Sequence, residues 1–67
     1  MSEQQLREYF EKKYKEEWYT VEVLARMLNV STQTIYNWRD EGKIILIWEG
    51  SWKILKKDLI DFLVNKN

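Results

Sequence analysis

The chain has 67 residues, of which 45% are hydrophobic and 33% are charged, so it can build one small hydrophobic core. It contains neither cysteine nor histidine, which excludes disulfides and thiolate zinc sites and removes the commonest general base. Eleven basic and eleven acidic residues cancel, so any phosphate binding must come from a local cluster of cations. We therefore expect no enzyme, no cofactor and no metal site.

The hydropathy pattern predicts a cytoplasmic protein without a membrane role. The longest apolar run, Ile44–Trp48, is far shorter than the ~20 residues that span a bilayer. No stretch has the layout of a signal peptide. Ten aromatic side chains must supply much of the core in so short a chain, and we expect most of them to be buried there.

The first predicted element is a helix over residues 2–17. Ser2 followed by Gln5 matches a capping box. An apolar stripe with a spacing of four residues follows, formed by Leu6, Phe10, Tyr14 and Trp18. We expect this helix to fold back on the rest of the chain; a surface for self-association is the alternative.

Two short helices follow. Thr20 is a good N-cap for a second helix, and Asn29 suits the left-handed residue that ends it. Ser31 is the expected N-cap of a third helix over residues 32–41, which Gly42 ends. Helices joined by so brief a turn cross steeply, which is helix-turn-helix geometry.

The C-terminal third predicts a hairpin and a final helix. Residues 43–55 have β character, with Gly50-Ser51 as a two-residue turn, and a helix is expected over residues 56–65. Ile44–Trp48 is apolar on both faces, whereas a solvated hairpin alternates. We therefore expect the second face to be covered by the first helix, the last helix or another protomer.

The motifs agree in order with a known family. They are Leu24-Ala25-Arg26-Met27-Leu28-Asn29-Val30-Ser31, Thr34-Ile35-Tyr36-Asn37-Trp38, Glu41-Gly42-Lys43, Trp52-Lys53-Ile54 and Lys57-Asp58-Leu59. This pattern resembles the excisionase-type branch of the MerR-like winged helix-turn-helix proteins. The expected fold is mainly α with a small β-hairpin, as one domain over residues 1–67. It divides into an added helix at 1–17 and a winged helix-turn-helix core at 18–65.

The resemblance implies a prokaryotic or phage protein that binds double-stranded DNA in a sequence-specific way. It would be a recombination directionality factor or a transcriptional regulator, with self-association on adjacent sites and a recombinase or other protein as partner. Residues 32–41 would enter the major groove and residues 44–55 would lie on the backbone. The candidate DNA-binding residues are Ser31, Thr32, Gln33, Tyr36, Asn37, Arg39, Lys43, Ser51 and Lys53, with Arg26 as a flanking cation.

The charge pattern departs from this family. Thr32-Gln33 and Glu49-Gly50-Ser51 stand where members of the family usually carry arginines. From residue 20 onward the chain has seven basic and six acidic residues, a net charge of only one positive unit. Phosphate contacts supply much of the affinity for DNA, so a single copy should bind weakly. The alternative is a protein-interaction module on a winged-helix scaffold with little DNA binding of its own.

Overall fold

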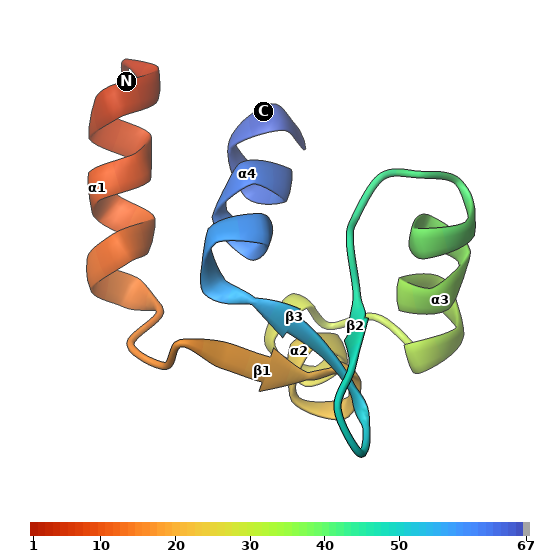
Figure 1. Cartoon of the computed structure of the whole chain (residues 1–67). Coiled ribbons are helices and arrows are strands. Elements are labelled where there is room, and N and C mark those ends of the chain that lie inside the picture. Colours follow the sequence, from red (N-terminus) through yellow and green to blue (C-terminus); the bar gives the residue numbers. More distant parts are fainter. Residues whose placement is uncertain (67) are drawn as a thin grey trace.

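A computed structural model describes residues 1–66 of the chain, with side chains up to Asn65. In Figure 1, α1 (Glu3–Lys13) and α4 (Lys56–Lys66) stand side by side, and α3 (Thr32–Asp40) lies on the other flank. A small antiparallel sheet joins the two flanks, with the strand order β1 (Trp18–Thr20), β3 (Trp52–Leu55), β2 (Ile47–Trp48). The helix α2 (Val21–Leu28) packs on this sheet. The result confirms the predicted winged helix-turn-helix with an added N-terminal helix.

The first helix folds back on its own chain, as expected. The predicted capping box of Ser2 and Gln5 is present, and Phe10 is buried. Arg7 Nη1 donates a 2.7 Å hydrogen bond to Asp61 of α4. Hydrogen bonds to Asp61 and Glu3 raise the pKa of the Arg7 guanidinium. Lys56 Nζ of α4 lies 3.0 Å from Glu11 Oε1, which closes the helix pair at its other end.

The predicted end of this helix at residue 17 is wrong. Tyr14 has extended backbone angles and ends the helix at Lys13, although its side chain is buried as the stripe required. Trp18 instead begins the strand β1 (Trp18–Thr20), and its side chain is 46% exposed. The pairing Tyr19↔Ile54 places this strand beside β3. Long-range pairing therefore outweighed the helical spacing of Trp18.

The helix-turn-helix follows the predicted caps. The Thr20 hydroxyl accepts the Val23 amide hydrogen at 3.2 Å, and the Ser31 hydroxyl accepts that of Thr34 at 3.1 Å. Asn29 adopts the left-handed conformation, with φ 56° and ψ 48°. Ala25 is buried and its carbonyl accepts the Val30 amide hydrogen at 3.0 Å, so the turn is tied to α2.

The left-handed backbone of Asn29 gives a first prediction. We expect Asn29→Ala to lower the free energy of unfolding by about 1 kcal/mol, because a Cβ without a compensating polar group disfavours this conformation. Asn29→Gly should leave it within a few tenths of a kcal/mol of the native value. Urea unfolding of the three proteins checks this. Equal stability of the alanine and glycine variants would contradict the role given to this backbone angle.

The predicted wing is shorter than expected. Only Ile47–Trp48 (β2) and Trp52–Leu55 (β3) form strands, and Ile44 is buried in the preceding loop. The pairing Trp48↔Trp52 leaves a loop of three residues, not two, with Gly50 at φ 77°. Ile45 is 63% exposed and Trp48 is 62% exposed, so neither α1 nor the described part of α4 covers this face. Cover by another protomer, the third alternative, stays a prediction.

One cluster of buried residues joins these elements. Its fully buried members are Val21, Leu24, Ile35, Ile54, Leu59 and Ile60. Of the ten aromatic side chains, Phe10 and Tyr14 are buried, five more pack against the cluster, and Tyr9, Trp18 and Trp48 are exposed. The aromatic contribution to the core is therefore close to the prediction, and the three exceptions lie on the surface.

Candidate nucleic-acid interface

The third helix presents a polar face to solvent. Ile35 is fully buried and anchors α3 in the core. Thr32, Gln33 and Asn37 are exposed on the same helix. Gln33 Nε2 donates a 2.9 Å hydrogen bond to Asn37 Oδ1, so two carboxamide groups lie side by side one turn apart. Carboxamides donate and accept at once, which is what bidentate pairing with an adenine edge requires.

Ser31 and Thr34 have a structural task at the start of α3. The Ser31 hydroxyl accepts the Thr34 amide hydrogen, and the two hydroxyl oxygens lie 3.0 Å apart. Ser31 remains exposed at the helix N-terminus, where the positive end of the helix dipole favours an anion. The Ser31 hydroxyl therefore serves as the N-cap of α3, and a phosphate that binds there would meet a helix end that is already ordered.

Arg39 does not stand free on the recognition face. Its guanidinium carbon lies 5.1 Å from the centre of the Tyr36 ring and 4.9 Å from that of Trp52. Its Nη2 also lies 3.0 Å from a carboxylate oxygen of Asp40. The structure therefore places Arg39 and Tyr36 in a stack that joins α3 to β3.

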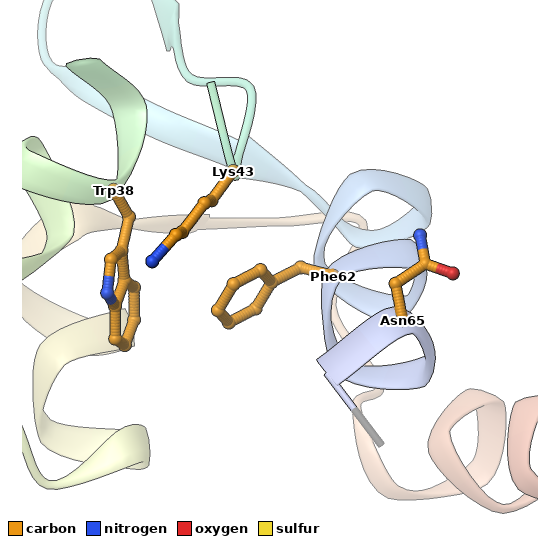
Figure 2. A pocket seen from close by; sticks show the side chains of 4 residues that line it. All are labelled: Trp38, Lys43, Phe62 and Asn65. Carbon is orange, nitrogen blue, oxygen red and sulfur yellow. The ribbon is translucent and has the colours of Figure 1, made fainter. Parts of the chain in front are cut away.

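Lys43 lies apart from the exposed carboxamides. Its Nζ is 3.1 Å from Glu41 Oε1. Figure 2 shows the ammonium directed toward a cleft of about 430 Å³ between α3 and α4, which Trp38, Phe62 and Asn65 also line. The Trp38 and Phe62 rings are 5.0 Å apart between centroids. Lys43 therefore lines this cleft and is paired with Glu41.

The two wing candidates differ in position. Ser51 is half-buried in the tip loop, and its carbonyl accepts the Glu49 amide hydrogen at 3.1 Å. Lys53 Nζ lies 4.1 Å from the centre of the Trp18 ring on β1. Because side chains alternate along a strand, Lys53 points to the opposite sheet face from Trp52. The structure thus brings Gln33 and Asn37 together, leaves Thr32 exposed on the same helix, and holds Lys53 on another face.

Few cations around the helix-turn-helix are free of an acidic partner. Among the side chains described from residue 18 onward, Arg26 and Lys53 make no ion pair, and Lys53 lies over a ring. Arg26 is exposed on α2. The sequence indicated it only as a flanking cation. Sequence reasoning also missed the stack of Arg39 on Trp52, which no periodicity signals.

Two helices crossing at a three-residue turn, followed by a hairpin beside the second helix, define a winged helix-turn-helix domain (Figure 1). A comparison with protein families matches residues 18–66 to the helix-turn-helix domain. The chain belongs to this excisionase-like family of DNA-binding domains, which typically are not enzymes. No curated protein and no solved structure matches the chain. Within the described residues, no helix is long and apolar enough to cross a membrane.

Proposed function

We propose that this protein binds double-stranded DNA in a sequence-specific way, with α3 in the major groove. The observation that carries the proposal is the exposed pair of carboxamides, Gln33 and Asn37, held 2.9 Å apart on a helix whose other side is fixed by Ile35. A rigid helix with paired donors and acceptors can read base edges. Thr32 lies beside them and suits a thymine methyl group or a phosphate.

The remaining contacts would position the helix. Arg26 on α2 and Ser31 at the start of α3 are exposed, and each suits a phosphate on either side of the groove. The wing would meet the flanking backbone through Ser51 in the tip loop. Lys53 would reach that backbone only after leaving the Trp18 ring, whose centre is 4.1 Å from its Nζ. Lys43 would approach the same backbone only after leaving Glu41, from which its Nζ is 3.1 Å.

The shortage of unpaired cations supports a cooperative role. Each phosphate that a cation neutralises adds to the affinity for DNA. This interface offers few unpaired cations, so a single copy should bind weakly. Binding of several copies to adjacent sites, or docking beside a recombinase, would supply the missing affinity. We therefore infer an accessory factor, excisionase-like or a MerR-like regulator, that works in the cytoplasm on the DNA of a prokaryote or phage and catalyses no reaction.

Fluorescence anisotropy of a labelled duplex tests the proposal. A duplex recovered by selection from a random pool should bind at low salt, and the association constant should fall as salt rises. An unrelated duplex of equal length should bind more weakly. Selection that enriches no sequence would contradict base recognition, and absence of binding at low salt would contradict DNA binding by this chain.

A protein-interaction module remains the second candidate, because an apolar surface accompanies the balanced charge. Ile45 and Trp48 are 63% and 62% exposed. An apolar contact with a protein should persist as salt rises, whereas DNA binding weakens. A salt titration of any complex formed by the chain therefore separates the two functions.

Acidic residues beside the interface give a second prediction. Glu41 holds the Lys43 ammonium at 3.1 Å, and both side chains are more than half exposed. Glu41→Gln should raise the affinity for DNA about 2- to 10-fold at low salt, because it frees a cation and removes a charge that repels phosphate. Glu16→Gln, which removes an exposed charge before β1, is the control. Anisotropy at two salt concentrations measures both, and equal effects of the two variants would contradict a local role for Glu41.

A further inference from the structure

We propose that Arg39 is a positioning residue that fixes the wing against the recognition helix, and that it does not contact DNA. This inference rests on the proposed function, because a fixed wing matters only if α3 and the hairpin engage one duplex. The sequence points the other way, since an arginine on a recognition helix is the usual partner of guanine or phosphate.

The Arg39 guanidinium lies close to two aromatic rings and to one carboxylate. Its carbon lies 5.1 Å from the Tyr36 ring centre and 4.9 Å from the Trp52 ring centre. Nε and Nη2 lie 3.1 and 3.0 Å from Asp40 Oδ1. Only about a third of the side chain is exposed. A guanidinium held in this way has little charge to offer a phosphate, because Asp40 balances it.

The stack links two elements that would both face DNA. Tyr36 belongs to α3 and Trp52 to β3, so the planar group bridges the recognition helix and the wing. Trp48 continues the contact toward the tip loop, because its ring meets that of Trp52 edge to face at 5.5 Å. Figure 1 shows the hairpin tip and the start of α3 toward the end of the molecule away from both termini. The stack therefore sets where the tip loop lies relative to Gln33 and Asn37.

Arginine and lysine differ in the way that tests this role. Both carry a positive charge, but only the planar guanidinium can stack on aromatic rings. A phosphate contact requires the positive charge, whereas a positioning role requires the planar guanidinium that stacks on the rings. Arg39→Lys keeps the charge and loses the stack, and Arg39→Met keeps the alkyl chain and loses the charge.

The experiment measures DNA affinity and its salt dependence on two duplexes, with the wild-type protein and both variants. The long duplex carries the selected site with flanks that reach the wing, and the short one holds only the bases under α3. We expect both variants to bind the long duplex about 5- to 20-fold more weakly, with unchanged salt dependence. All three proteins should bind the short duplex alike. Trp52→Phe should weaken binding to the long duplex in the same direction, and adding Arg39→Lys to it should cost less than in the wild type.

The other outcomes are distinct. Arg39 would contact a phosphate if Arg39→Lys bound DNA with wild-type affinity and Arg39→Met lowered the magnitude of the salt slope by about 0.9. That result would overturn this inference and leave the proposed function standing. Equal losses on both duplexes would also overturn it, because they indicate damage to α3 itself. Failure of the wild-type protein to bind would overturn the proposed function and the inference together. Circular dichroism at the working temperature confirms that each variant is folded, and Trp52→Phe carries the test if an Arg39 variant is not.

Discussion

Replacing Phe10 by alanine is expected to lower the free energy of unfolding by about 3–5 kcal/mol. Phe10 is 8% exposed, and its ring packs against Tyr14 at a centroid distance of 6.0 Å. A chain of this size has a total stability of roughly 3–10 kcal/mol, so the variant should lose much of its folded population. Urea unfolding followed by far-ultraviolet circular dichroism measures the effect.

Lys12→Ala on the same helix is the matched control. Lys12 is exposed and forms no ion pair among the described residues, so its removal should change stability by less than about 0.5 kcal/mol. The family match begins at Trp18, beyond α1. If Phe10→Ala were as stable as the control, α1 would not belong to the core, and the observed packing of α1 on α4 would be without energetic consequence.

Removing the paired carboxamides of α3 is expected to weaken binding to the selected duplex about 5- to 100-fold for each substitution. The reason is the loss of a bidentate base contact in Gln33→Ala or Asn37→Ala. Alanine favours a helix, and both side chains are exposed, so the fold should survive. Anisotropy measures affinity for the selected duplex and for one with a changed base pair, and each variant should discriminate less between them.

Gln4→Ala supplies the control for this experiment. Gln4 is an exposed carboxamide on α1, where its Nε2 donates a hydrogen bond to Glu8 at 3.1 Å. The same chemical change far from α3 should leave DNA affinity unaltered. If Gln33→Ala and Asn37→Ala behaved like Gln4→Ala, α3 would not be the element that reads bases.

The sequence predicted those parts of the fold that local chemistry controls. Thr20, Asn29 and Ser31 each bond to or shape the backbone within three residues, so their types alone indicate where α2 and α3 begin and end. The buried stripe of α4 was also predicted, since Leu59, Ile60, Leu63 and Val64 recur at helical spacing and all are buried. These features need no knowledge of distant segments.

The strand β1 could not be predicted in this way. Trp18 continues a helical spacing, yet it pairs with Leu55, thirty-seven positions along the chain. The Glu17 carbonyl also accepts the Lys56 amide hydrogen at 2.9 Å. Pairing over such a distance depends on where β3 lies, which no local pattern records. The same limit explains why the predicted wing was too long.

The candidate site shows the same division. Gln33 and Asn37 are four residues apart, so their common face follows from helical geometry. The partner of Arg39 is Trp52 on another element, at 4.9 Å. Helical spacing places Arg39 near Tyr36 but cannot place Trp52 beside it.

A two-dimensional ¹⁵N NMR titration of the protein with the selected duplex tests directly whether α3 recognises DNA. We expect the amide signals of Thr32–Asn37 to shift most, those of Arg26 and Ser51 to shift as well, and the α1 signals to stay unchanged. Shifts concentrated at Ile45 and Trp48 or on α1, with α3 unaffected, would contradict recognition of DNA by this helix.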